Sequence, residues 1–444
     1  MTPGTPFTDL INRALVKGAN CSWIAIWMIA ACAHAADPAM VARGEYLAKV
    51  ADCVSCHTAG SGHPLFAGGL PIKSPFGIIY STNITPDPIS GIGQYTYPDF
   101  SRAVREGIAK DGRRLYPAMP YASFAATSDS DIQALYAYFM EGVKAVNHTP
   151  PQTRLPFPFN QRWTLMFWSA AFVNQERYKP RSDRTVQWNR GAYLVQALGH
   201  CGACHTPRGF AYQEKAYSEP SPDYLSGAVV DNWFAANLTG SQASGLGRWS
   251  ETEISLFLET GHSAGQVAFG SMVAVIENST QHLRKEDLNA IAHYLKSLPA
   301  RKEKPTYKSH KSPAMPGEIV LVGTGIDQFE RPGAGVYAGF CAKCHGNNGT
   351  GQPPKIPQLG GNSMVLSEKT SSLIRQMLEG GKGPQTRNGP EPKEMPSFGK
   401  KLTDRDIADV LTYVRNSWGN TAAPVTPRDV SMLREALQKR WGSQ

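Results

Sequence analysis

Three copies of the pentapeptide Cys-x-x-Cys-His contain the residues of this sequence that are best suited to chemistry. They run from Cys53 to His57, from Cys201 to His205 and from Cys341 to His345. Two thiols at this spacing can add to the vinyl groups of haem as thioethers, and the adjacent His can bind the iron from the proximal side. The sequence therefore predicts three covalently bound haem c groups and a function in electron transfer.

The predicted haem-binding residues follow directly from the motifs. The covalent anchors are Cys53, Cys56, Cys201, Cys204, Cys341 and Cys344, and the proximal iron ligands are His57, His205 and His345. Zinc is the main alternative, but structural zinc usually takes a second, matching ligand pair close in sequence, and none is present. A thioredoxin-like dithiol does not need the trailing His. Haem is therefore favoured, and no residue is expected to catalyse substrate chemistry.

A six-coordinate haem needs a second axial ligand, and a Met downstream of each motif is the natural choice because a thioether raises the reduction potential. The predicted distal ligands are Met119 in Tyr-Pro-Ala-Met-Pro, Met272 in Gly-Ser-Met-Val and Met395 in Glu-Met-Pro-Ser. His63 and His262 are the alternatives. Each proximal imidazole should also donate its remaining N–H to a backbone carbonyl, and residues 357–359 offer one to His345.

Each motif lies within a repeat of the same organisation. A helical pattern with a glycine precedes the motif, at Gly44, at Gly191 and, more loosely, at Gly333 to Gly335. An amphipathic helix that begins near Asp131, Asp287 or Asp406 closes each repeat. Because glycine lets two helices approach closely, we expect the first helix of each repeat to cross the last and to enclose the haem.

An Asn-x-Thr loop occurs at the same place in the first two repeats. It comprises residues 83–85 and residues 237–239, each followed by a Gly-x-Gly sequence. Asn-x-Thr is also a glycosylation acceptor, but its recurrence at one point of the repeat indicates a structural role near the haem edge.

The repeats predict a mainly α protein made of three tandem class I cytochrome c-like domains with one haem each. The expected domains are residues 38–150, 185–300 and 320–420, joined by linkers at 151–184 and 301–319. Residues 421–444 form a C-terminal tail that can adopt an amphipathic helix. That helix would lie on a membrane surface or cap the third domain.

The N-terminus indicates export. Residues 1–35 combine Arg13 and Lys17 with an apolar stretch and a small-residue cleavage site before Ala36, which is typical of a signal peptide. The alternative is a lipoprotein signal that would leave an acylated Cys32 at the mature N-terminus. No other apolar run is long enough to cross a bilayer. We therefore expect a periplasmic protein that is peripherally associated with the inner membrane.

Charge and aromatic content indicate the kind of partner. The formal net charge is +9, and haem propionates reduce this excess to a modest one that suits an anionic membrane or an acidic protein. No nucleic-acid partner is expected. Residues 162–173 form an aromatic stretch in the first linker. This stretch would either pack between domains or contact a dehydrogenase subunit or the membrane interface.

Several segments together resemble a known family. They are the three haem motifs, Asn-Ile-Thr-Pro-Asp-Pro, Tyr-Pro-Ala-Met-Pro-Tyr, Gly-Ser-Met-Val and Trp418-Gly419-Asn420. In these the chain resembles the triheme cytochrome c subunit of membrane-bound bacterial dehydrogenases that act on alcohols, gluconate, sorbitol, fructose or aldehydes. The resemblance implies a catalytic partner subunit of the flavin, PQQ or molybdenum type. It also implies ubiquinone or a terminal oxidase as the electron acceptor.

Two other functions remain open from the sequence. One is a stand-alone periplasmic electron shuttle that serves an oxidase. The other is a multihaem enzyme of the peroxidase kind, which needs an open or displaceable distal position at one haem.

Overall fold

Helices dominate the computed structural model, which describes residues 37–301 and 331–441. Within these ranges the strands form four antiparallel two-stranded sheets, so the expectation of a mainly α protein is confirmed. The predicted signal peptide, with Cys21 and Cys32, lies outside the described residues, as do nearly all of the 301–319 linker and the start of the third predicted domain. No described helix has the length and apolar character needed to span a bilayer.

The first repeat contains five helices and one hairpin. In chain order they are α1 (Pro38–Val50), α2 (Cys53–His57), β1 (Pro71–Ser74), β2 (Gly77–Tyr80), α3 (Tyr97–Glu106), α4 (Tyr121–Phe124) and α5 (Asp129–Ala137). A π-helical turn, Tyr138–Gly142, continues α5. A 3₁₀ turn, Arg162–Thr164, and α6 (Leu165–Phe172) follow in the connection to the second repeat.

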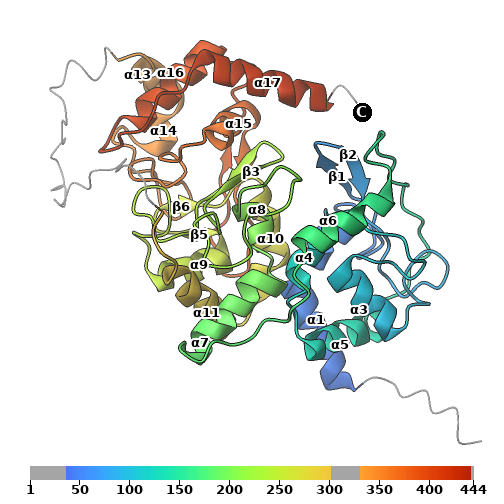
Figure 1. Cartoon of the computed structure of the whole chain (residues 1–444). Coiled ribbons are helices and arrows are strands. Elements are labelled where there is room, and N and C mark those ends of the chain that lie inside the picture. The colour runs from blue at the N-terminus through green and yellow to red at the C-terminus, as the bar shows by residue number, and fades with distance from the viewer. Residues whose placement is uncertain (1–36, 302–330, 442–444) are drawn as a thin grey trace, which may run out of the picture. The chain divides into compact units, whose positions relative to one another are not determined.

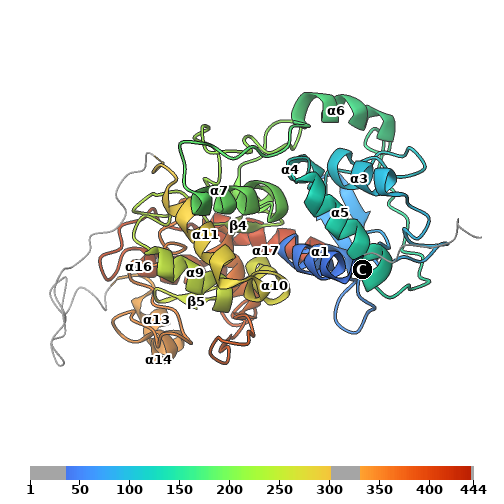
Figure 2. The same ribbon diagram turned by 90° about the horizontal axis from the view of Figure 1, so that it is seen from below.

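The second repeat has the same order of α-helices and hairpins as the first, with one hairpin added. It comprises α7 (Val186–Tyr193), a π-helical turn (Leu194–Leu198), α8 (Gly202–His205), β3 (Ala228–Val230), β4 (Trp233–Ala235), α9 (Glu251–Thr260), β5 (His262–Ser263), β6 (Gln266–Val267), α10 (Ser271–Asn278), a 3₁₀ turn (Thr280–His282) and α11 (Lys285–Lys296). Figures 1 and 2 both show α7 lying along α11, the first and last helices of this repeat.

The described part of the third repeat is more compact. It comprises α13 (Ala334–Phe340), α14 (Ala342–His345), α15 (Ser371–Glu379), β7 (Gly381–Lys382), β8 (Glu394–Met395), α16 (Asp404–Arg415) and α17 (Pro427–Trp441). Val430, Leu433 and Leu437 of α17 are buried in the core of this repeat. The Arg434 side chain pairs with Asp404 at the start of α16 (2.8 Å). The C-terminal helix therefore packs as a cap on the third repeat.

Local sequence explains where several of these helices begin. Thr96, Ser250 and Thr403 are the N-caps of α3, α9 and α16. In each case the hydroxyl accepts from the third helical residue, whose carboxylate in turn accepts from the N-cap backbone N–H. Such a capping box satisfies backbone N–H groups that the helix leaves unpaired, and it typically stabilises the fold by about 1 kcal/mol.

Glycine permits the close helix crossing in every repeat. A Cβ atom on Gly44 would lie 1.9 Å from the carbonyl oxygen of Ala134 in α5, and one on Gly191 would lie 2.0 Å from that of Ala290 in α11. The expected crossing of first and last helices is confirmed. In the third repeat the equivalent residue is Gly333, where a Cβ atom would lie 2.2 Å from the carbonyl oxygen of Asp409 in α16. A Cβ atom on Gly335 would meet open space.

The spacing between this glycine and the motif differs among repeats. Gly44 precedes Cys53 by nine positions, but Gly191 precedes Cys201 by ten. The π-helical turn Leu194–Leu198 lies between them and takes up the additional residue, since each π-type bond encloses one residue more than an α-type bond.

The crossing predicts how glycine substitutions change stability. Gly44→Ala should lower the free energy of unfolding by about 2 kcal/mol or more, because the new methyl group overlaps the Ala134 carbonyl. Gly335→Ala, in open space within α13, should raise it by about 0.5–1 kcal/mol. Urea unfolding of the haem-loaded protein measures both, and equal effects would contradict the role of the crossing.

Candidate haem-binding sites

Short helical turns hold each of the predicted proximal histidines. His57, His205 and His345 end α2, α8 and α14. Their Nδ1 atoms donate to backbone carbonyls of Thr82 (2.7 Å), Ala236 (2.7 Å) and Pro357 (3.1 Å), respectively. The expected carbonyl partner is therefore present at all three sites, including the one from residues 357–359. This bond fixes the ring and its tautomer and leaves Nε2 with a lone pair for a metal.

The Asn-x-Thr loops hold two of these carbonyls. Thr82 and Ala236 directly precede Asn83 and Asn237, whose side chains are buried. The side-chain Oδ1 of Asn83 accepts from the backbone N–H and the hydroxyl of Thr85 (2.9 and 2.7 Å), and Asn237 repeats this pattern with Thr239. The predicted structural role of the loop is thus explained. The repeated sequence indicated the loop, but its link to the predicted proximal histidine follows only from the tertiary structure.

Burial favours the neutral forms of the cysteines and histidines of the first two motifs. Burial raises the pKa of the Cys53 and Cys201 thiols to about 12, and it lowers the pKa of the His57 and His205 imidazoles. Zinc sites and redox dithiols use thiolates with lowered pKa values, whereas haem c takes thioethers and a neutral imidazole. The residues present therefore fit haem c.

The three predicted distal methionines occupy different local structures. Met119 lies between α3 and α4, Met272 lies in the first turn of α10, and Met395 is in β8; each is partly buried. The Gln376 amide of α15 donates to the Met395 sulfur at 3.6 Å. The three assignments as iron ligands stay predictions.

The two alternative ligands differ in their surroundings. His63 is exposed. His262 is 2% exposed, and its Nδ1 donates to the Thr260 carbonyl at 2.8 Å. Among the described residues its Nε2 has no hydrogen-bond partner, and it lies next to Gly383, in the β7–β8 connection of the third repeat.

Two tyrosines are exchanged between the first and second repeats. The Tyr46 hydroxyl of α1 donates to Asp287 of α11, and the Tyr193 hydroxyl of α7 donates to Asp131 of α5, both at 2.5 Å. Each aspartate also pairs with the arginine of its own repeat, Arg190 with Asp287 (2.7 Å) and Arg43 with Asp131 (2.5 Å). The recurrence of Arg-Gly-x-Tyr before two motifs is the sequence signal for this interface.

The same interface brings the first two motifs together. Ser55, between the cysteines of the first motif, accepts from Asn278 at the end of α10 (2.9 Å). His200, directly before Cys201, donates from Nε2 to the Ala51 carbonyl at 3.2 Å, two residues before Cys53. The first two motifs therefore lie close together, although they are far apart in sequence.

Contacts from α15 join the third repeat to the second. The Arg375 guanidinium lies 4.3 Å from the centre of the Trp233 ring and donates to the Asp231 carbonyl at 2.6 Å. A Cβ on Gly270 would lie 2.8 Å from the same indole. Trp233 therefore packs against Gly270, two residues before Met272. Because Gln376 contacts Met395, neighbouring residues of one helix act on the distal segments of two repeats.

Comparison with known proteins identifies the family. The Cytochrome c family model matches residues 331–418, which contain the third motif. The gluconate 2-dehydrogenase cytochrome c subunit of Pantoea cypripedii is 45% identical, over 92% of this chain and 93% of its own length. This chain belongs to the family of dehydrogenase cytochrome c subunits. The resemblance predicted from the sequence is thus confirmed, as is covalently bound haem c as the type of cofactor.

Two further relatives match this cytochrome c subunit over most of its length. The cytochrome c subunit of alcohol dehydrogenase (quinone) from Gluconacetobacter polyoxogenes is 46% identical, over 90% of this chain and 85% of its own. The fructose dehydrogenase cytochrome subunit of Gluconobacter japonicus is 39% identical, over 89% and 82%.

The exchanged tyrosines predict a stability difference. Tyr46→Phe and Tyr193→Phe should each lower the free energy of unfolding by about 1.5–3 kcal/mol, because each removes a hydrogen bond to a buried carboxylate. Tyr136→Phe is the control, since its hydroxyl donates to a neutral carbonyl, that of Tyr95 (3.0 Å), and should cost about 1 kcal/mol or less. Urea unfolding distinguishes these values, and a larger loss in the control would contradict the prediction.

The Asp287 carboxylate predicts a pH dependence. Burial alone would raise its pKa, but hydrogen bonds from Arg190 and Tyr46 outweigh this and hold the pKa below its usual value. A lowered carboxyl pKa contributes stability above the unfolded pKa of about 4, and this contribution disappears as the pH falls through the folded pKa. Asp287→Asn should therefore be destabilised at pH 7 and approach the wild type in acid. Asp111→Asn, at an exposed site, should show no such convergence in urea titrations across pH.

Proposed function

We propose that this cytochrome carries three haem c groups, one in each of three domains with the limits 38–150, 185–300 and 320–420. The observation that carries the proposal is the repeated proximal arrangement, a Cys-x-x-Cys turn that ends in a His bonded to a carbonyl. Haem c, when bound, supplies reversible one-electron chemistry at iron. The chain's own contribution is to anchor, orient and shield these groups.

We further propose that the chain relays electrons from a catalytic dehydrogenase subunit to ubiquinone or the respiratory chain. The support is that its relatives are named as subunits of gluconate, alcohol and fructose dehydrogenases, one of them with quinone in its name. The catalytic partner would be of the flavin, PQQ or molybdenum type and would oxidise an alcohol, sugar or aldehyde. The complex would lie on the periplasmic side of the inner membrane.

Tertiary contacts support a relay within one chain. The exchanged Tyr46 and Tyr193 join the first repeat to the second, and Arg375 joins the third to the second. Neighbouring sites are thus held by buried polar contacts rather than by linkers alone. Purification of the native complex tests the partner, because a large subunit with its own organic cofactor should copurify; a chain that is always isolated alone would favour the free shuttle.

Haem number and distal ligation can be tested together. The denatured holoprotein should retain the mass of three haems, and Met119→Ala, Met272→Ala and Met395→Ala should each lower one reduction potential and open one iron to cyanide or CO. Met377→Leu is the control, because Met377 is buried in the third core. Cyanide binding in the unmodified protein would instead favour an enzyme of the peroxidase kind.

Gln376 should tune the third site through Met395. An amide that donates to a thioether sulfur withdraws electron density from it, which favours ferrous iron. Gln376→Leu should therefore lower the potential of one haem and leave the other two unchanged in a spectroelectrochemical titration. If all three potentials stay the same, the Met395 sulfur is not an iron ligand or the 3.6 Å contact has no electronic effect.

A further inference from the structure

The α6 helix rests on the protein through the half-buried Leu165, Trp168, Ser169 and Phe172, and its other face is exposed and apolar. Its sequence, Leu-Met-Phe-Trp-Ser-Ala-Ala-Phe, carries no charge, and none of its eight residues is buried. A surface helix of a water-soluble domain normally buries an apolar stripe and exposes polar side chains. Large aromatic side chains in particular stabilise a fold mainly when they are buried. The composition of α6 therefore suits a surface that is covered by something outside this chain.

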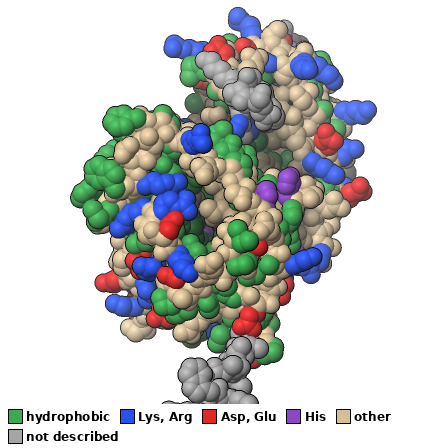
Figure 3. Space-filling view, turned by 90° about the vertical axis from the view of Figure 1, so that its right-hand side faces the viewer, with side chains coloured by type: hydrophobic (Ala, Val, Ile, Leu, Met, Phe, Trp, Pro, Cys, Tyr) green, Lys and Arg blue, Asp and Glu red, His purple; other side chains and the backbone are tan. Residues whose placement is uncertain are grey.

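The exposed side chains around α6 form a larger set, which we call the α6 surface. Phe157 is 79% exposed, Trp163 63%, Phe167 60% and Phe210 96%. Phe159 and Met166 are also exposed and complete the set. Figure 3 shows a gathering of hydrophobic side chains at its left edge, on the side where α6 lies, with Lys and Arg side chains beside it. Contiguous apolar surface of this kind usually marks an interaction site.

The α6 surface is held in place by both of the first two repeats. The Trp168 indole N–H donates to the Ala211 carbonyl of the second repeat at 2.9 Å, and its ring lies 6.0 Å from that of Tyr121 in the first. Phe172, the last residue of α6, contacts Phe210 with ring centres 6.1 Å apart. The exposed side chains thus project from a supported helix, which reduces the entropy cost of binding.

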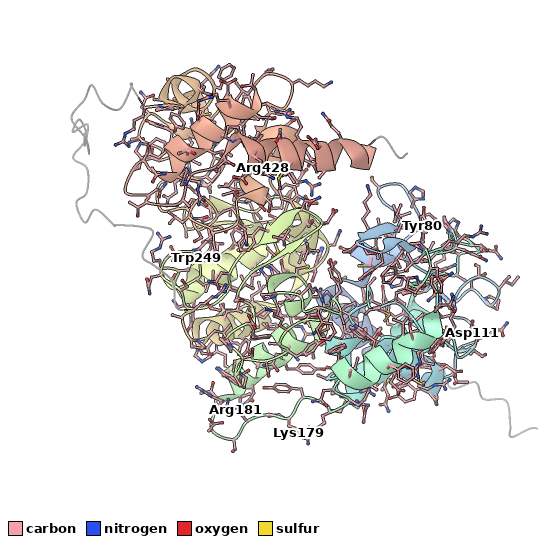
Figure 4. All side chains as sticks on the ribbon, turned by 45° about the horizontal axis from the view of Figure 1, so that its top comes forward. Tyr80, Asp111, Lys179, Arg181, Trp249 and Arg428 are labelled. Atoms are coloured by element: carbon pink, nitrogen blue, oxygen red, sulfur yellow. The ribbon has the colours of Figure 1, made fainter. Side chains whose placement is uncertain are left out.

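Basic side chains accompany the aromatic ones. Arg162 donates to the Arg114 carbonyl at 2.8 Å and lies 4.0 Å from the Tyr116 ring centre. Lys215 lines a pocket with Phe172 and Phe210, in which Glu214 and Asp223 also lie. In the described ranges neither Arg162 nor Lys215 forms an ion pair. By contrast, Arg181, which projects with Lys179 from the connection after α6 (Figure 4), pairs with Asp183 and Glu219.

We propose that the α6 surface docks on an anionic lipid bilayer, with Trp163 and Phe167 entering the interface and Arg162 and Lys215 facing lipid phosphates. Trp is favoured at membrane interfaces, and apolar side chains flanked by Lys or Arg bind anionic lipids. A protein partner would need about ten hydrogen bonds over a standard interface, whereas five of the six residues of the α6 surface have side chains without a hydrogen-bond donor. The proposal rests on the proposed function, because quinone is a membrane-dissolved acceptor.

Vesicle co-sedimentation of the haem-loaded full chain tests the proposal. The wild type should bind vesicles of phosphatidylcholine with phosphatidylglycerol more tightly than vesicles of phosphatidylcholine alone. Trp163→Ser with Phe167→Ser should weaken binding about tenfold or more. The matched control is Ile89→Ser with Val186→Ser, which are 83% and 88% exposed elsewhere on the surface, and it should bind as the wild type does.

Charge reversal provides a second, independent variant. Lys215→Glu should weaken binding to the anionic vesicles, whereas Lys179→Glu, at a lysine next to Glu176, should change it little. Unchanged haem spectra and reduction potentials in all variants would show that the proposed electron relay is intact, so that a loss of lipid binding reports on the α6 surface alone. Conversely, missing haem with intact lipid binding would overturn the proposed function and not the docking.

Two results would overturn the docking proposal. One is equal vesicle binding by the wild type and the Trp163→Ser, Phe167→Ser variant. The other is a variant that keeps its vesicle binding but no longer copurifies with a catalytic subunit, since the α6 surface would then be a contact with that subunit.

Discussion

The crossing of the first and last helices of each repeat, with a glycine in place of a side chain, is the constraint on which the rest of this structure depends. At Gly44 and Gly191 there is no room even for a methyl group. Each motif begins within about three helical turns of this glycine. The crossing therefore determines where the cysteines and the predicted proximal His lie. It also aligns Asp131 and Asp287 with the arginines that precede the glycines.

The first two repeats share a hydrophobic core, whereas the third meets the second mainly through hydrogen bonds. The first two also exchange Tyr46 and Tyr193 in a reciprocal manner, each donating to the carboxylate of the other repeat. The third repeat has its own core, which includes α17, and contacts the second through Arg375 and the β7–β8 connection.

Burial explains how the predicted haem ligands are prepared for their role. Desolvation disfavours the charged forms of cysteine and histidine alike, which keeps Cys53 and His57 neutral. Orientation comes from a second source, the hydrogen bond from each Nδ1 to a carbonyl. In the first two repeats that carbonyl belongs to the residue before a buried Asn, whose side chain ties the loop to Thr85 or Thr239. Burial therefore sets the protonation state, and the loop sets the direction of the ring.

The sequence by itself determined the repeat pattern, the close helix crossing and the family, and it predicted the covalent anchors and the proximal histidines, because these depend on residues within a few helical turns of one another. Tertiary structure alone decided which carbonyl each His uses, that Gly333 rather than Gly335 meets the last helix, and that one face of α6 is left exposed while α17 is covered. Tyr46 and Asp287 are 241 positions apart, and no local periodicity encodes such a pair. Its existence follows only from how two folded repeats pack, where burial makes one hydrogen-bonded arrangement much more favourable than the others.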